Sequence, residues 1–258
     1  MVGGSAILCF ICILYLKMRI ALKNIIDQSY QVFSAYKVGP TLDVCTECCV
    51  TKEEELKLAT TAVEKIPFDL LYSYHTAGKP QHPTINEFKH FAPRYLDLTA
   101  SLKFVSHSVE IVLRTFAEIN DWTNKETELL NSFGKEFFDH CLNTYPLPEN
   151  EEISSILIML DNGGFEIDVY LSDWEKVNNI ESVLHFSDLI NYGFNDKKPD
   201  QLSSAFAEKK TSKTIFDWLN NGDLTALFKQ RIENLILNPN GISDKKQIEL
   251  SSAYDRLV

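Results

Sequence analysis

Glycine is scarce in this sequence, with 10 residues in 258. Loops that hold a nucleotide or a phosphate need closely spaced glycines, and neither Gly-x-x-x-x-Gly-Lys nor Gly-x-Gly-x-x-Gly occurs. The metalloprotease pattern His-Glu-x-x-His and the Gly-x-Ser-x-Gly elbow of hydrolases are missing as well. These absences disfavour the common cofactor-dependent and hydrolytic enzymes, and they predict that no organic cofactor is bound.

Positive charge is also in short supply. The chain has 25 Lys and Arg against 36 Asp and Glu, so its formal net charge is −11. Nucleic-acid binding needs clustered basic side chains that displace counterions from phosphates. The densest basic run (Lys209, Lys210 and Lys213) is flanked by Glu208 and Asp217. We therefore predict no nucleic-acid partner, whereas an acidic, soluble chain is compatible with a basic protein partner.

Cysteines are few, and the apolar run near the N-terminus is short. Six cysteines do not make a disulfide scaffold, which favours a reducing compartment and predicts a cytoplasmic protein. The run at residues 6–16, AILCFICILYL, is shorter than the roughly 20 residues of a spanning helix, and Lys17 and Arg19 follow it. Segment 1–17 is therefore an anchor with these charges on the cytoplasmic side, a helix packed on the body, or sequence upstream of a true start at Met18. We favour the start at Met18; a membrane-tethered protein is the alternative.

The dominant periodicity is helical. Apolar residues in 20–33 recur at three- and four-residue steps, and strand patterns are few. Capping boxes begin at Thr51, Thr84 and Thr123, each followed by an apolar stripe at helical spacing. We therefore expect an all-α protein, either an irregular helical bundle or a solenoid-like array of short helices.

A break in this pattern divides the chain. Residues 145–152 (YPLPENEE) combine two prolines with a charge run, which predicts a boundary between a helical domain at 18–145 and a helical subdomain at 149–258. Beyond the break, an apolar helix over 153–160 ends at Asp161-Asn-Gly-Gly164. Short helices are expected near 166–176, 179–192, 200–209, 211–220, 222–237 and 244–256.

Residues 42–50, LDVCTECCV, place three of the six cysteines within five positions. Cys45 and Cys48 have the Cys-x-x-Cys spacing with which two thiolates grip one zinc ion from a tight turn. They precede a predicted helix start, where free N–H groups stabilise thiolates. A metal site at Cys45, Cys48 and Cys49 needs a further ligand, and the candidates are His75, His82, His90 and Cys141.

Two other interpretations of this cluster stay open. A Cys-x-x-Cys at a helix start can present a nucleophilic thiolate, although that motif belongs after a strand in a βαβ unit, and none is visible in this sequence. The three thiols can also be reduced, partly buried packing residues. We give this packing interpretation at least as much weight as metal binding, because the cluster supplies only half of a metal-ligand set.

Two polar stripes contain histidines. His90, Arg94 and Asp97 lie one helical turn apart around Pro93, where a helix should kink or restart. A second stripe, on a helix expected through residues 107–118, is formed by His107, Glu110, Arg114 and Glu118. Acid–base chemistry is conceivable for the first stripe. We favour surface ion pairs for both.

Four stretches in order resemble a family of uncharacterised bacterial proteins: Phe33–Tyr36 (FSAY), Leu42–Cys49 (LDVCTECC), His90–Leu96 (HFAPRYL) and Ser106–Glu110 (SHSVE). The resemblance covers about residues 19–118 and leaves the C-terminal half untouched. Because the family has no established activity, the resemblance implies no function. It implies a bacterial, cytoplasmic setting and a single site that unites the cysteine cluster with the two histidine stretches.

The sequence supports two functional hypotheses. The first is an acidic helical protein that acts by binding another protein, as an adaptor or immunity-like protein does, with a structural metal clip at Cys45 and Cys48. The alternative is a metal- or thiol-dependent enzyme whose site combines the cysteine cluster with His75, His90 or His107. A closed four-ligand metal site favours the first hypothesis, and an open coordination position favours the second.

Overall fold

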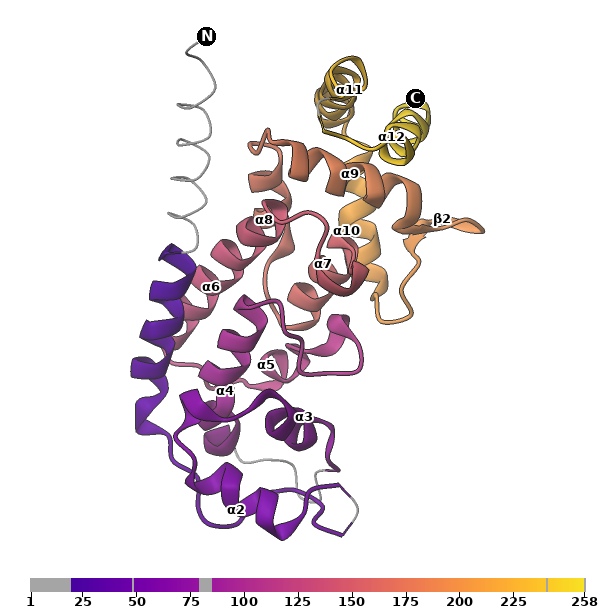
Figure 1. Cartoon of the computed structure of the whole chain (residues 1–258). Helices are drawn as coiled ribbons and strands as arrows, with labels where there is room; N and C mark the ends of the chain where they lie inside the picture. The colour runs from indigo at the N-terminus through magenta and orange to yellow at the C-terminus, as the bar shows by residue number, and fades with distance from the viewer. Residues whose placement is uncertain (1–19, 48, 79–84, 240, 258) are drawn as a thin grey trace. The chain divides into compact units, whose positions relative to one another are not determined.

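The computed structural model describes residues 20–47, 49–78, 85–239 and 241–257. The described chain is an all-α array of short helices with a small two-stranded hairpin, as predicted (Figure 1). It forms two compact units, one ending at Phe137 and the other beginning at Phe138, so the division falls inside a helix, α6. Among the described residues, no helix combines the length and the apolar character needed to cross a membrane. Segment 1–17 and the predicted start at Met18 lie outside the described residues.

The first unit begins with helical residues 20–32, which continue into the 3-10 helix η1. Its elements are η1 (Phe33–Ala35), α2 (Lys52–Thr60), η2 (Val63–Lys65), α3 (Phe68–Thr76), α4 (Ile85–Ala100), η3 (Val109–Ile111), α5 (Arg114–Glu118) and the greater part of α6 (Asn124–Leu142). Aromatic rings fill its core: Phe88 packs edge-on against Phe116, and Phe116 stacks on Trp122.

The second unit contains η4 (Pro148–Asn150), α7 (Ile153–Asn162), α8 (Ile167–Trp174), α9 (Ile180–Tyr192), β1 (Phe194–Asn195), β2 (Lys198–Leu202), α10 (Lys209–Leu219), α11 (Gly222–Leu237) and α12 (Asp244–Arg256). Its core is built on Trp174, which is fully buried and stacks on Trp218. Phe186 and Phe228 stack beside them at 3.8 Å between ring centroids.

Two predicted helix starts are confirmed. The Thr51 side chain accepts from the Glu54 N–H, and the Glu54 carboxylate accepts from the Thr51 N–H, which starts α2. Thr123 and Glu126 make the same reciprocal pair at the start of α6. Thr84 lies outside the described residues.

Two local predictions are wrong, and one of the two alternatives at Pro93 is excluded. The helix expected near 200–209 is replaced by β2 and a turn, because Asn195 Oδ1 accepts from the Lys197 N–H and starts a hairpin. The helix expected through 107–118 is interrupted: His107 lies in a bend and only η3 and α5 form, because Ser106 Oγ accepts from the Ser108 N–H. Of the predicted kink or restart at Pro93, the restart does not occur, because Pro93 lies within α4.

Candidate functional site

Residues 42–50 form a turn that we call the Cys45 turn. Its backbone folds on itself, since the carbonyl of Cys45 accepts from the N–H groups of Cys49 and Val50 at 3.3 and 3.1 Å. Cys45 and Cys49 therefore belong to one turn, whereas Cys48 lies outside the described residues. The apolar side chains of the turn are buried and anchor it to the first unit: Leu42, Val44 and Val50.

Two carboxylates hold the start of this turn. Glu55 of α2 accepts from the Leu42 N–H at 2.8 Å, and Glu87 of α4 accepts from the Asp43 N–H at 3.1 Å. Hydrogen bonds to a charged acceptor are stronger than neutral ones. The position of the turn is thus fixed by side chains from α2, which follows it directly, and from α4, which is distant in sequence.

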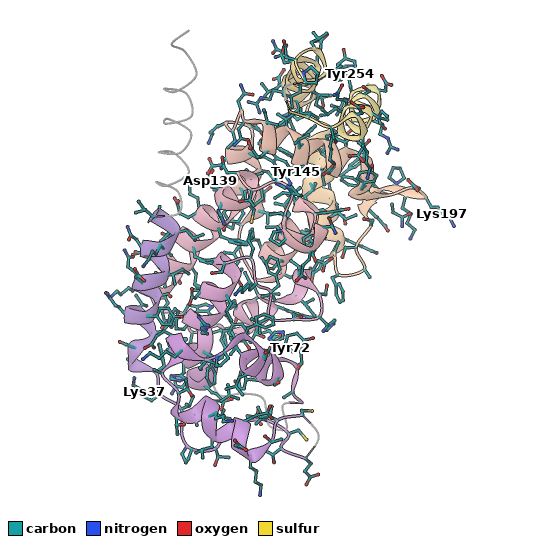
Figure 2. All side chains as sticks on the ribbon, viewed as in Figure 1. Lys37, Tyr72, Asp139, Tyr145, Lys197 and Tyr254 are labelled. Atoms are coloured by element: carbon teal, nitrogen blue, oxygen red, sulfur yellow. The ribbon has the colours of Figure 1, made fainter. Side chains whose placement is uncertain are left out.

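The Cys45 turn also contacts the segment that follows α3. The N–H of Cys45 donates to the carbonyl of Gly78 at 3.0 Å. A Cβ built on Gly78 would be 3.8 Å from the Cβ of Cys45, so the two chains approach closely. His75 occupies the last turn of α3, three residues before Gly78, and Tyr72 of the same helix is labelled in Figure 2. The cysteine segment and the chain that carries His75 are therefore hydrogen-bonded neighbours.

A buried polar cluster lies under the turn, formed by Tyr74, Glu87 and Tyr95 with Asp43 and His75. Glu87 is 7% exposed and accepts from the Tyr74 hydroxyl at 2.7 Å. Burial, together with the nearby Tyr95, Glu87 and Asp43, holds the pKa of Tyr74 far above its usual range. The Tyr74 and Tyr95 hydroxyls are thus neutral hydrogen-bonding groups at any physiological pH.

Two histidines near this cluster have oriented rings. His90 Nδ1 lies 3.0 Å from the carbonyl of Tyr36. Because a carbonyl only accepts, Nδ1 carries the proton and Nε2 keeps a lone pair. Burial lowers the pKa of His90, so the imidazole is neutral at pH 7. His75 Nδ1 lies 3.3 Å from the Tyr95 hydroxyl. A neutral imidazole oriented through one nitrogen is the form that binds a metal through the other.

The structure brings together only part of the predicted metal ligands. Cys45 and Cys49 share the turn, His75 precedes the segment that the turn contacts, and His90 follows Glu87 by one turn of α4. Among the described residues, no three His, Cys, Asp or Glu side chains are arranged as metal ligands. Cys48 and His82 lie outside those residues. Cys141 belongs to the second unit, and its burial holds the pKa of the thiol well above its usual range.

The rest of the first polar stripe has a structural role. Arg94 pairs with Asp97 at 2.6 Å and donates from Nε to the carbonyl of Ile66. Asp97 also accepts from the Tyr30 hydroxyl at 2.8 Å. These contacts join the helix over 20–32, η2 and α4; the Arg94–Asp97 ion pair is partly buried, whereas a surface pair was predicted.

The sequence did not reveal a buried ion pair in the same unit. The Lys89 side chain, 2% exposed, lies 3.0 Å from the Glu126 carboxylate, which is equally buried. Lys89 Nζ also donates to the Asp121 carbonyl and lies over the rings of Tyr36 and Trp122. Burial alone would lower the pKa of Lys89, but the bonds to Glu126 and Tyr36 outweigh it and raise the pKa. Both groups are therefore charged inside the core.

The sequence did not reveal the polar cluster either, because its contacts depend on how the helices pack. The capping box predicted for Glu87 involves Thr84, which lies outside the described residues. The Glu87 carboxylate accepts from the Tyr74 hydroxyl and the Asp43 N–H, and neither contact was predicted. Tyr74 is adjacent to His75 in sequence, which was the one available signal. Its pairing with Glu87 is set by how α3 packs against α4.

Comparison with known proteins adds no assignment, because no protein-family model, curated protein or solved structure matches the chain. The resemblance to uncharacterised bacterial proteins therefore stays a prediction. Any functional proposal for this chain rests on the geometry of the Cys45 turn and its neighbours and on the distribution of charge.

Proposed function

We propose that this chain acts by binding a basic protein partner, and that a zinc ion clips the Cys45 turn to the segment after α3. The observation that supports the clip is the hydrogen bond from the Cys45 N–H to the Gly78 carbonyl. It joins the Cys-x-x-Cys segment to the part of the chain that carries His75 and, further on, His82. The two halves of a ligand set thus come from neighbouring segments.

The ligand chemistry favours zinc over harder cations. Thiolates and neutral imidazoles are the ligands of structural zinc sites. Cys45 and Cys48 supply the thiolates, Cys49 is a third candidate, and a histidine completes the set from His75, His82 or His90. Glu55 and Glu87 stabilise the turn by accepting hydrogen bonds from its backbone, as residues that surround a metal site commonly do.

The proposed partner is inferred from charge. The second unit has 11 Lys and Arg against 20 Asp and Glu, and so carries −9 of the net charge of −11. The start of helix α8 displays Glu166 and Asp168 beside Val169, an exposed apolar side chain. Such a surface speeds the encounter with a basic partner and becomes less effective as salt screens it.

Affinity capture tests this function. The full chain is the bait, beside a Glu166→Lys/Asp168→Lys variant and a Lys197→Glu/Lys198→Glu control on the exposed hairpin. We expect one basic protein in stoichiometric amount on the parent, roughly tenfold less of it on the first variant, and no loss on the control. Equal capture by all three baits, or no stoichiometric partner in lysate of the source cells, would contradict the proposal.

The enzyme hypothesis is supported by one observation. The Tyr74 and Tyr95 hydroxyls and the Glu87 carboxylate are buried next to the Cys45 turn and can donate and accept hydrogen bonds there. A metal- or thiol-dependent enzyme would use them together with His75 or His90; His107, in the bend before η3, is the third predicted residue. A bound metal that keeps an exchangeable water ligand would favour this hypothesis over the clip.

A further inference from the structure

Helix α12 buries the fewest residues of the α-helices in the second unit, although α11 buries only three. It buries only two of its side chains, Leu250 and Ala253, whereas α9 buries seven residues. It packs against α9 and α11, beside which it lies in Figure 1, and its Tyr254 is labelled in Figure 2. Apart from these two residues and Leu257, which follows the helix and is also buried, the attachment of α12 consists of polar contacts.

One lysine provides the central polar contact. Lys246 Nζ lies 2.6 Å from Asp188 Oδ1 of α9 and 2.6 Å from Glu249 Oε2 of α12 itself. It also lies 5.1 Å above the ring of Tyr145, whose hydroxyl donates to Asp188 Oδ2 at 2.8 Å. The Lys246 and Asp188 side chains are 23% and 18% exposed. This pair is shielded enough to contribute more than a surface salt bridge does.

The remaining polar links are hydrogen bonds, among them those from Ser187 and Arg256, and a cation–π contact of Lys229 with Tyr254. The carbonyl of Glu249 accepts from Asn191 Nδ2 at 2.8 Å, and Ser252 donates to Asn191 Oδ1 at 3.0 Å. Lys229 of α11 donates to the carbonyl of Leu257, just after α12. Each of these is individually weak, so the Lys246–Asp188 pair is the contact on which the helix depends most.

We propose that α12 is a detachable strap, held closed by the Lys246–Asp188 pair, which covers the surface formed by α9 and α11. Release of the pair opens this surface while the aromatic core around Trp174 stays folded. Opening is a local transition of a segment with few apolar contacts, such as hydrogen exchange detects below global unfolding. The transition involves the second unit alone and depends neither on zinc nor on the proposed partner.

Hydrogen exchange of the full chain tests the strap. The variants are Lys246→Met and, as the matched control, Lys245→Met, whose side chain is 87% exposed on the same helix. We expect amides of 244–256 to exchange about 10- to 100-fold faster in Lys246→Met than in the parent. Protection of α10 should not change in either variant, and Lys245→Met should match the parent throughout.

A second variant keeps the test valid if Lys246→Met does not fold. Asp188→Asn removes the charge on the α9 side at constant size and should accelerate exchange in 244–256 in the same local manner. Unchanged exchange in α12 of both variants would overturn the inference. Equal acceleration in α12 and α10 would overturn it too, because the helix would then unfold with its unit rather than detach.

Discussion

Replacing Lys89 by Met is expected to lower the free energy of unfolding of the chain by about 3–5 kcal/mol. Met has similar length and no charge, so the substitution leaves the buried Glu126 carboxylate without its cationic partner 3.0 Å away. The Tyr36 hydroxyl and the Thr123 N–H still donate to Glu126, but neither compensates its charge. Urea unfolding followed by circular dichroism and by tryptophan fluorescence measures the loss.

Two further variants separate charge from packing. Lys125→Met, at an exposed position beside Glu126, should change stability by less than about 0.5 kcal/mol. Lys89→Met/Glu126→Leu removes both charges and should recover part of the stability lost in Lys89→Met. A loss below about 1 kcal/mol in Lys89→Met would show that the pair does not hold the first unit together.

Removal of the proposed zinc ion is expected to have a comparably large effect. Structural zinc contributes about 10–16 kcal/mol to the folding of small zinc domains. In this chain the first unit is stabilised by an aromatic core as well as by the ion. We therefore expect EDTA to lower the thermal midpoint of the zinc-loaded chain by more than about 10 °C. Hydrogen exchange should accelerate in 42–78, which contains the Cys45 turn, and not in α7 of the second unit.

The Cys45→Ser variant is the control for chelation. It should already have the lower midpoint and should show no further shift when EDTA is added. If the parent loses its metal to EDTA without any change in midpoint, the ion does not clip the two segments. The Cys45–Gly78 hydrogen bond would then be sufficient without a metal.

Much of the fold could be predicted because its signals are local. The helices expected at 222–237 and 244–256 are present as α11 and α12, and their starts are capped by the side chains of Asn221 and Ser243. The helix predicted near 200–209 is absent. The Lys197 N–H donates to the Asn195 side chain two residues earlier, and this hydrogen bond stabilises a hairpin turn instead. A helical pattern over about ten residues does not outweigh a preceding turn that is stabilised by one of its own side chains, here Asn195.

The site was less predictable, because its contacts join residues that are far apart in sequence. The spacing of Cys45 and Cys48 was visible, but not that Glu87 would hold the Cys45 turn from a distance of 44 positions. A lysine such as Lys89 is expected on a solvated face, and only the packing of α4 against the start of α6 gives it a buried partner. Tertiary contacts of this kind leave no periodic trace in the sequence.

The metal content of the purified full chain tests the zinc clip most directly. Elemental analysis for zinc and iron would compare the parent with Cys45→Ser and with Cys141→Ala, which removes a buried thiol of the second unit. We predict about one zinc per chain in the parent and in Cys141→Ala, and little in Cys45→Ser. No metal in any of the three, with all of them folded, would contradict the clip and make the cysteines of the Cys45 turn ordinary thiols.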